Sequence, residues 1–257
     1  MCKQQLIACV EQDKKTVPYM YINLKTYDEN NLQVKVWEDP SENRGGYLKY
    51  YDCLHFYTND EHYPISNLLD TIDVVNPRVI MLQEKVGENV EQLIKNKYLL
   101  ERNYIIDMDA VGERKQGIYR SKVVKRESIP AIVDLLLTED EYSIVYDRES
   151  LLNQLLDRYD SGISRFYAIE ENGSIIASCS SYGETKELAI VGGVIVHRDF
   201  RGRGYAFDVD AHICVDLFHE GKSCISFVNY ENKASLALHK KLGGVIYSTY
   251  YKYIRRE

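Results

Sequence analysis

The sequence predicts an α/β fold in which helices flank a sheet, and three observations lead to this prediction. Strand-like and helix-like patterns alternate along residues 119–243. The pair Asn172-Gly173 separates two apolar runs, which is a strong signal for a β-hairpin. Residues 194–206 have the pattern of an apolar strand, a basic turn with two glycines and the start of a helix. Alternating elements of this kind build a sheet covered by helices.

The second half of the chain gives its expected elements in a clear order. A strand is expected over residues 119–127, followed by a helix over 129–137 with Ser128 as its N-cap and Pro130 in its first turn. Leucines at helical spacing predict another helix near 151–159. The later elements are the hairpin strands 165–169 and 175–180, a long strand 187–196, a helix over 206–218, a strand 224–228 and a helix that opens at Asn232.

The first half repeats much of this order without the basic turn. Residues 59–67 contain no glycine and carry two acidic side chains, so they are not expected to hold an anion. Domains of 1–112 and 113–257 are expected, because residues 110–117 are polar and bracketed by glycines, as linkers commonly are. The elements expected in the first half are strands at 33–37, 47–51, 54–58, 78–82 and 104–108, with helices near 65–72 and 86–94.

The segment 194–206 has the chemistry of a pyrophosphate site. Helix N-termini leave backbone N–H groups without partners, and glycines let the backbone approach an anion closely. Arg201 and Arg203 add positive charge, and the helix dipole acts in the same direction. An ordinary connection between a strand and a helix is the alternative explanation, and the segment that follows favours the anion site.

The composition limits the classes of partner. The formal net charge of −7 and a pI near 5.5 argue against a nucleic-acid-binding protein driven by phosphate neutralisation. The longest apolar run, residues 188–196, has about half the length needed to cross a membrane, so no membrane partner is expected. Six cysteines without a C-x-x-C pair are typical of reduced thiols in a cytoplasmic protein.

After the basic turn the chain continues as a helix, a strand and residues 229–244, which end in a Lys-Leu-Gly-Gly sequence. This order resembles the GNAT superfamily of N-acetyltransferases over roughly residues 119–257. The family's Arg/Gln-x-x-Gly-x-Gly/Ala turn is matched by Arg201, Gly204 and Ala206. The resemblance implies the GNAT fold, of the α+β kind with a mixed, mostly antiparallel sheet flanked by helices. It also implies a tandem protein whose N-terminal half is a degenerate, non-catalytic GNAT-like domain.

The resemblance implies acetyl-CoA as a co-substrate and no metal. Gly192-Gly193 in the long strand predicts a bulge, although a loosely packed strand also explains two glycines. In the family such a bulge parts two strands and the pantetheine arm lies between them, bonded here to the backbone of Val194 and Val196. The expected cofactor-binding residues are Val194, Ile195, Val196, Arg201, Gly202, Arg203, Gly204, Tyr205, Ala206 and Asn232.

Acyl transfer to an amine needs a base for the amine and a proton for the departing thiolate. Glu187, with Glu184 as its neighbour, lies where many GNAT enzymes have a carboxylate for the first task, and exposed turn residues are the alternative explanation for both. Much of the family has a tyrosine as proton donor seven residues after the helix-opening asparagine. That position is His239 here, and histidine, with an ordinary pKa near 6.5, suits a proton donor. Tyrosines at 247, 250 and 251 are the alternative donors.

Other charged groups give weaker predictions. Asp208 and His212 share a helical face but have no third ligand, so they do not predict a metal site. The acidic run 139–141 suits either a cationic amine or simple solubility. Only residues 245–257 follow the last helix, whereas the family usually closes with a hairpin. Part of the acceptor site is therefore expected from the first half or from another subunit, which leaves a homodimer open.

The sequence thus predicts a cytoplasmic, acetyl-CoA-dependent N-acetyltransferase. Its acceptor is expected to be a primary amine of a small molecule or peptide, and the transfer to be direct, in a ternary complex with Glu187 and His239 as catalytic residues. The alternative is a non-catalytic acyl-CoA-binding or protein-interaction module on the same fold, which the histidine at 239 and the degenerate first half suggest.

Overall fold

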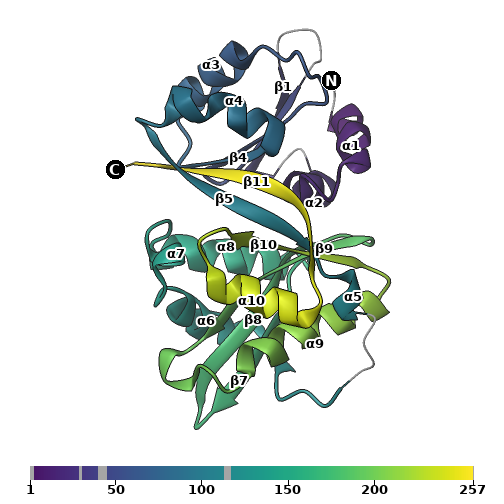
Figure 1. The fold of residues 1–257 in the computed structure, drawn as a ribbon, viewed down its shortest axis with the longest axis vertical. Coiled ribbons are helices and arrows are strands. Elements are labelled where there is room, and N and C mark those ends of the chain that lie inside the picture. The colour runs from purple at the N-terminus through teal and green to yellow at the C-terminus, as the bar shows by residue number, and fades with distance from the viewer. Residues whose placement is uncertain (1–2, 29–30, 40–44, 113–116, 257) are drawn as a thin grey trace. The chain divides into compact units, whose positions relative to one another are not determined.

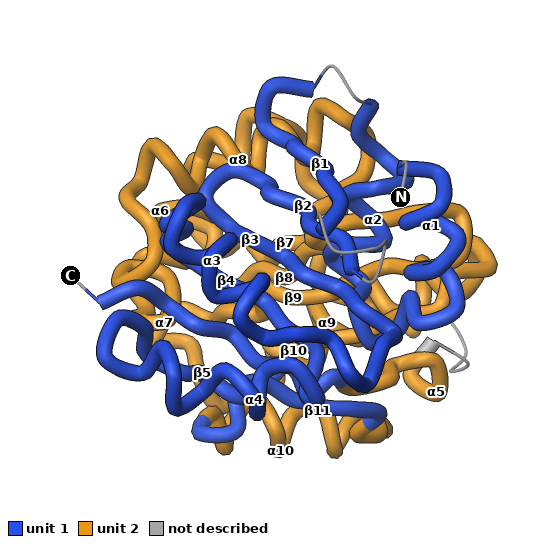
Figure 2. Tube along the Cα trace, turned by 90° about the horizontal axis from the view of Figure 1, so that it is seen from above, with its two compact units in different colours: residues 1–105, 228–231, 247–257 blue, residues 106–227, 232–246 orange. Residues whose placement is uncertain are grey.

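The structure is a computed structural model of the chain, and it describes residues 3–28, 31–39, 45–112 and 117–256. The chain forms two compact units (Figure 2). The predicted domain boundary after residue 112 adjoins residues 113–116, which lie outside the described residues. Neither unit is a continuous stretch of chain, since unit 1 contains residues 1–105, 228–231 and 247–257, and unit 2 contains residues 106–227 and 232–246.

Unit 1 is built on a mixed sheet with strand order β1-β2-β3-β4-β11-β5. Strands β1 to β3 are antiparallel, β3 and β4 are parallel and joined through α3, and β11 pairs antiparallel with β4. The elements are α1 (Lys3–Gln12), α2 (Pro18–Thr26), β1 (Val34–Glu38), β2 (Gly46–Tyr50), β3 (Cys53–Tyr57), α3 (Ile65–Val75), β4 (Val79–Gln83), α4 (Glu84–Ile94) and most of β5 (Tyr98–Asp107) and β11 (Val245–Arg255).

The C-terminal strand β11 completes the core of unit 1. Figure 1 shows this strand, in yellow, beside β5. Tyr251 and Tyr253 pack into the apolar cluster between the sheet and the helices α3 and α4. The Tyr253 hydroxyl donates to the Gly87 carbonyl at 2.6 Å, and Gly87 has no side chain to collide with the Tyr251 ring. The first half of the chain therefore obtains one of its central strands from the other end of the sequence.

Unit 2 has the strand order β10-β9-β8-β7-β6, in which only β9 and β10 are parallel. Helix α9 packs against β7, β8 and β9, and α6 and α8 pack on β8. This arrangement confirms the predicted mixed, mostly antiparallel sheet flanked by helices. The elements are α5 (Asp109–Gly112), β6 (Lys122–Val123), α6 (Ile129–Leu136), α7 (Asp140–Ser143), α8 (Arg148–Asp160), β7 (Phe166–Glu171), β8 (Ser174–Glu184), β9 (Leu188–Val196), α9 (Tyr205–His219), β10 (Ser223–Asn229) and α10 (Lys233–Leu242).

One local prediction for unit 2 was wrong, and a second, the N-cap of α6, was confirmed in its position. The strand expected over residues 119–127 is only β6, because Asp208 on α9 accepts hydrogen bonds from the Arg120 and Ser121 backbone N–H groups and holds that stretch away from the sheet. Ser128 stands at the N-cap of α6 without a side-chain cap bond, since a short 3₁₀ helix runs directly into α6. The Asn172-Gly173 hairpin was predicted correctly, with positive φ at both residues.

Strand β9 pairs with β8 along most of its length but with β10 only in its first half. Its pairing with β10 runs from Leu188 opposite Ser223 to Val191 opposite Ser226. Just beyond, the β8–β9 register shifts by one residue near Gly192-Gly193, so the predicted bulge is present. The two glycines thus stand where β9 leaves its parallel neighbour.

Candidate functional site

The start of α9 forms an open, glycine-lined turn. Gly202 and Gly204 have positive φ angles of 77° and 82°, a conformation that other residues adopt only with strain. Gly204 is the N-cap of α9, and among the described residues no side chain caps the helix there. A Cβ built on either glycine meets no described atom within 4 Å. The turn therefore leaves room for an anion beside the first N–H groups of α9, which have no partner within the helix.

The two arginines of this turn also shape it. Arg201 Nε donates to the Val196 carbonyl at 3.0 Å, and its Nη2 pairs with Glu139. Arg203 Nη2 donates to the Asp199 carbonyl at 3.1 Å. Arg201 is half exposed, so its charge still reaches the open turn. Glu139, the first acid of the run considered for a cationic amine, has its charge balanced by Arg201.

The other predicted cofactor residues take different positions. Ile195 is buried in the core with α6 and α8, so its side chain is not available to a ligand. Tyr205 is also buried, and its hydroxyl donates to Glu171 at 2.5 Å. Asn232 is the N-cap of α10, where its side chain accepts from the Ser235 N–H at 3.0 Å. Val194 and Ala206 are partly exposed on β9 and in the first turn of α9.

Two tyrosines that the sequence did not single out lie at the bulge. A Cβ on Gly192 would come within 2.7 Å of the Tyr182 ring, and a Cβ on Gly193 within 2.7 Å of its hydroxyl. That hydroxyl is 2.6 Å from the hydroxyl of Tyr142 on α7. With 22 tyrosines in the chain, nothing in the sequence could distinguish this pair.

The carboxylates considered as bases lie at the opposite end of β9 from the turn. Glu187 is exposed just before β9, and its carbonyl accepts from the Ser223 N–H at 2.8 Å. The strand from there to Val196 is roughly 30 Å long at about 3.3 Å per residue. Glu184 is buried between Arg165 at 2.8 Å and Lys222 at 2.6 Å, so its carboxylate is held in a structural ion-pair network.

His239 is buried in unit 2 between α10 and α9. Its Nδ1 is 2.8 Å from the Ser235 carbonyl, and its Nε2 is 3.6 Å from an oxygen of Asp210. Both histidine 239 and Asp210 have almost no exposed surface. Of the alternative donors, Tyr250 and Tyr251 are buried in unit 1 and Tyr247 is exposed. The sequence missed Asp210, because an aspartate in an amphipathic helix is usually solvated.

The pair considered for a metal has other partners. Asp208 accepts three hydrogen bonds from Arg120 and Ser121, and His212 Nδ1 is 2.9 Å from the Ser121 hydroxyl. The Tyr119 ring stacks on His212 with ring centres 4.4 Å apart. Within the described ranges, no group of three or more histidine, cysteine or acidic residues is placed to hold a metal ion. The pair thus fastens residues 119–121 to α9.

In unit 1 the carboxylate of Asp39 lies beside α3, the helix that follows β3. Asp39 is buried and accepts hydrogen bonds from the hydroxyls of Tyr47 at 3.1 Å and Tyr63, and from the side chain of Asn67 at 3.3 Å. Burial raises the pKa of Tyr47 to about 12, and burial and Asp39 raise that of Tyr63 further. These three side-chain donors are therefore already used by Asp39.

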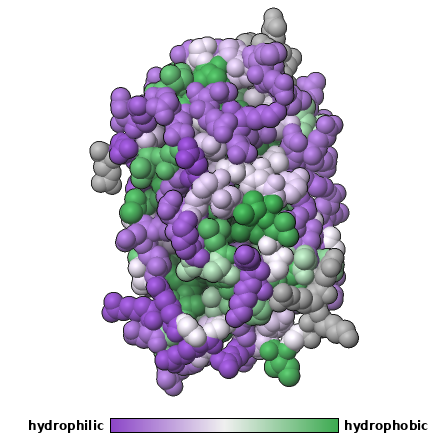
Figure 3. Space-filling model, viewed as in Figure 1, coloured by the Kyte–Doolittle hydropathy of each residue, from purple (hydrophilic) through white to green (hydrophobic). Residues whose placement is uncertain are grey.

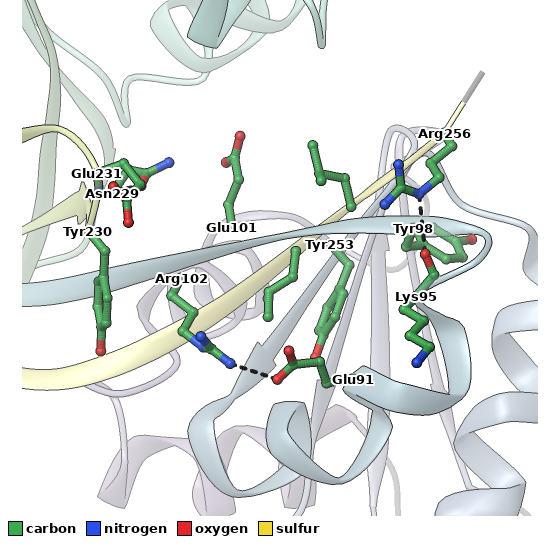
Figure 4. A pocket seen from close by; sticks show the side chains of 12 residues that line it. Glu91, Lys95, Tyr98, Glu101, Arg102, Asn229, Tyr230, Glu231, Tyr253 and Arg256 are labelled. Atoms are coloured by element: carbon green, nitrogen blue, oxygen red, sulfur yellow. Dashed lines mark hydrogen bonds and ion pairs between the residues drawn. The ribbon is translucent and has the colours of Figure 1, made fainter.

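A hollow of about 520 Å³ is present in unit 1 (Figure 4). Its charged side chains largely satisfy one another. Arg102 pairs with Glu91 at 2.7 Å, Glu101 pairs with Lys252 at 2.9 Å, and Arg256 Nε donates to the Lys95 carbonyl at 3.2 Å. We assign this hollow no ligand, because its lining offers few polar groups that still need a partner.

The surface drawn in Figure 3 is mainly hydrophilic, with separate hydrophobic patches. None of the helices in the described ranges combines the length and the apolar character that a membrane crossing requires.

Comparison with known proteins matches residues 130–244 to the model of the acetyltransferase (GNAT) family. A search of curated proteins found no match. Among solved structures, a Drosophila protein aligns over 98% of this chain and 95% of its own, with a TM-score of 0.71 and 10% identity. A GCN5-related N-acetyltransferase from Kribbella flavida aligns over 94% and 96%, with a TM-score of 0.61 and 11% identity.

A tandem GNAT protein from the clavulanic acid biosynthesis pathway aligns over 98% of this chain and 95% of its own, with a TM-score of 0.59 and 11% identity. Identities this low establish similarity of fold. This similarity of fold extends over nearly the whole chain, as the predicted tandem arrangement requires.

Proposed function

From the match of residues 130–244 to the model of the acetyltransferase (GNAT) family, we propose that the chain transfers an acetyl group from acetyl-CoA to a primary amine of a small molecule or a peptide. The observation that carries the proposal is the open turn at Gly202 and Gly204 at the start of α9. Arg201 links this turn to the end of β9, because its Nε donates to the Val196 carbonyl. The five described free cysteines favour the cytoplasm as its place of action.

The residues of the turn fit the anionic part of acetyl-CoA. The N–H groups of Tyr205 and Ala206 begin the helix, the glycines leave space beside them, and Arg201 and Arg203 supply charge. The gap that opens between β9 and β10 after Val191 offers strand backbone to an extended arm. Val196 already gives its carbonyl to Arg201, so Val194 is the better candidate for that contact. When bound, acetyl-CoA supplies an activated acyl group.

The proposed catalytic residues act on protons. The acceptor amine must lose a proton to become nucleophilic, and Glu187 is proposed as its final acceptor. The length of strand between Glu187 and Gly192 is roughly 16 Å, so the proton travels through water rather than by direct contact. His239 is proposed as the source of the proton for the departing thiolate. The Tyr142–Tyr182 hydroxyl pair lies at the bulge, where it can orient the acceptor amine by hydrogen bonds.

The alternative, a non-catalytic acyl-CoA-binding or protein-interaction module, is favoured by one observation. Both ring nitrogens of His239 face groups inside the protein rather than an open cleft. Turnover separates the two functions. The test incubates the protein with acetyl-CoA and a panel of primary amines and measures release of the free CoA thiol. Amine-dependent release supports the enzyme, and its absence across the panel together with tight acetyl-CoA binding supports the binding module.

Two glycine variants make this assay specific to the turn. Gly204 and Gly221 stand at the two ends of α9 with nearly equal φ angles, 82° and 81°, and a Cβ on either meets no described atom within 4 Å. Leucine at either position brings the same backbone strain. We expect Gly204→Leu to abolish thiol release and Gly221→Leu to retain it. Equal loss in both variants would contradict the proposed role of the turn.

A further inference from the structure

Asp210 is a carboxyl group enclosed within unit 2. It lies on α9 and has no exposed surface. Its Oδ2 has no hydrogen-bond partner among the described residues, and its Oδ1 accepts only the weak S–H of Cys214, at 3.8 Å. An ionised carboxylate in such surroundings needs either a proton or an opposite charge close by. The nearest group that can supply either is His239, whose Nε2 is 3.6 Å from Oδ2.

The other nitrogen of His239 fixes the protonation pattern of the ring. Nδ1 lies 2.8 Å from the carbonyl oxygen of Ser235, one turn earlier in α10. A carbonyl oxygen only accepts hydrogen bonds, so Nδ1 must carry a hydrogen. Nε2 then faces Asp210 either with a hydrogen, as an imidazolium, or with a lone pair. A lone pair facing an ionised carboxylate is repulsive, so a neutral ring requires a protonated Asp210.

We propose that Asp210 and His239 share a single proton inside unit 2, and that Asp210 is a positioning residue that keeps this proton available to His239. In one form a carboxylate faces an imidazolium across 3.6 Å, and in the other a carboxylic acid faces the lone pair of Nε2 across the same distance. Both forms have the same total charge and contain one proton between Oδ2 and Nε2.

The surroundings of the pair favour the single-proton state. Two cysteine thiols interact with Asp210: Cys214 on its own helix and Cys179 on β8. Burial, together with the charge of Asp210, holds the pKa of the Cys179 thiol well above its usual range, so this neighbour is uncharged near neutral pH. Burial also raises the pKa of Asp210, and the charge of His239 opposes that effect. Losing the proton would leave an uncompensated negative charge in the interior, and gaining a second would leave a positive one.

Asp210 lies on α9, the helix that packs against β8 and β9. The charge of Asp210 helps to raise the pKa of the Cys179 thiol. The sulfur of that thiol is 3.5 Å from the carbonyl of Gly192 at the bulge. Helices α9 and α10, which carry the two residues, contact each other in unit 2 (Figure 1). The shared proton is thus held behind the strand segment where the reaction is proposed to occur.

The consequence for catalysis rests on the proposed function. In acyl transfer the amine nitrogen forms a bond to the acyl carbon, the carbon–sulfur bond breaks, and the amine gives up one proton. His239 Nε2 turns from Asp210 and gives its proton to the departing sulfur. The ammonium proton of the amine has by then gone to Glu187. The second proton, which the amine nitrogen loses as the amide forms, passes through water to the pair, so the pair ends with the one proton with which it began. Asp210 touches no substrate and acts only through His239.

The direct test is nuclear magnetic resonance of the protein without ligand, with labelled histidine and aspartate. The Asp210 carboxyl carbon reports its ionisation, and the ring nitrogens of His239 report theirs. At pH 7 we expect the signals of the two groups together to account for one proton. An ionised Asp210 beside a singly protonated His239 overturns the proposal, as does a protonated Asp210 beside an imidazolium.

Two variants, each of which removes one member of the pair, test whether the proton is shared. In His239→Gln, Asp210 loses its charged partner and is expected to become protonated at pH 7, and an ionised carboxyl there contradicts the proposal. In Asp210→Asn, His239 is expected to be a neutral ring with its hydrogen on Nδ1. Asp216→Asn is the matched control, because Asp216 also stands 3.6 Å from a histidine on α9, His212, but at a partly exposed place. It should leave the signals of Asp210 and His239 unchanged.

The kinetic test uses an amine that supports turnover. Asp210→Asn is expected to move the alkaline fall of kcat to lower pH by about one unit, a tenfold loss on that limb, while acetyl-CoA affinity and the Asp216→Asn profile stay unchanged. A uniform loss at every pH would mean a merely structural role and overturns the positioning role. If no amine is turned over, the proposed function fails, whereas the resonance experiment still decides whether the proton is shared.

Discussion

The ring of Tyr182 occupies the space that a side chain at Gly192 would need. A Cβ there would come within 2.7 Å of a Tyr182 ring carbon. The backbone of Tyr182 is in turn held by Arg158 on α8, which donates to its carbonyl. The glycine of β9 and the tyrosine of β8 therefore fit each other, and the bulge that separates β9 from β10 is fixed by packing as well as by the conformational freedom of glycine.

Gly192→Ala should accordingly destabilise the protein by about 1–3 kcal/mol through overpacking. The cost should shrink by about 1 kcal/mol or more in a Tyr182→Ala background, because the ring that causes it is gone. Chemical denaturation of the single and double variants measures this coupling. A parallel cycle with Tyr159→Ala, a ring of the same apolar cluster, should be additive. Additivity in the Tyr182 cycle would contradict the packing relationship.

The Asp39 carboxylate in unit 1 predicts a single cofactor site per chain. It already accepts hydrogen bonds from Tyr47, Tyr63 and Asn67 beside α3, so no pyrophosphate is expected to bind there. Equilibrium dialysis with labelled acetyl-CoA should saturate at one molecule per chain. Two molecules per chain would mean that unit 1 retains a working site.

We expect the ion pairs of Glu220 to stabilise the folded protein at neutral pH and to lose this effect in acid. The Arg165 guanidinium, at 2.7 Å, holds the pKa of Glu220 at about 2, below its usual range, and Lys222 acts in the same direction. Because the folded-state pKa is lowered, the contribution is present above about pH 4.5 and is lost as the pH falls toward about 2. Glu220 is 43% exposed, so solvent screening limits the effect to less than about 1 kcal/mol.

Thermal unfolding of Glu220→Gln against the unsubstituted protein tests this. The difference in Tm should be present at pH 6 and vanish near pH 2. A difference that persists unchanged at pH 2 would show that the glutamine acts through packing and not through charge.

Because β11 pairs with β4 and contributes to the core of unit 1, we expect the last residues of the chain to stabilise this unit. Tyr253→Ala removes a buried ring and the hydrogen bond to the Gly87 carbonyl, and should cost about 3–5 kcal/mol. Tyr247→Ala, on the same strand but 52% exposed, should change stability by less than about 0.5 kcal/mol. Hydrogen exchange should show the loss of protection in β4 and β11. Loss of protection confined to α9 and β8 would contradict the assignment of β11 to unit 1.

The sequence predicted those features that depend on local chemistry. The turn at Gly202 and Gly204 and the hairpin at Asn172-Gly173 both need positive φ angles. Glycine and asparagine adopt such angles most readily, so their presence indicates the turns. The longer helices α3, α4, α6, α8, α9 and α10 and most strands were predicted from their residue patterns, whereas α2, α5 and α7 were not. The bulge at Gly192-Gly193 was predicted for the same reason, although the tyrosine that fits it was not.

Long-range pairing was beyond the reach of a single sequence. Nothing near Tyr253 indicates that its strand pairs with β4, more than 160 residues away. The tether from Asp208 to Ser121 shortened a strand that the residues themselves favoured. Asp210 was overlooked because its burial depends on the packing of α10 against α9, which the sequence does not show.

Calorimetric titration with acetyl-CoA tests the central claim, that the start of α9 holds the cofactor, most directly. The unsubstituted protein and Gly221→Leu should bind acetyl-CoA with the same affinity, whereas Gly204→Leu should bind at least about tenfold more weakly, a loss of about 1.4 kcal/mol, at a matched Tm. Equal affinity of all three proteins, or no binding to any of them, would contradict the account.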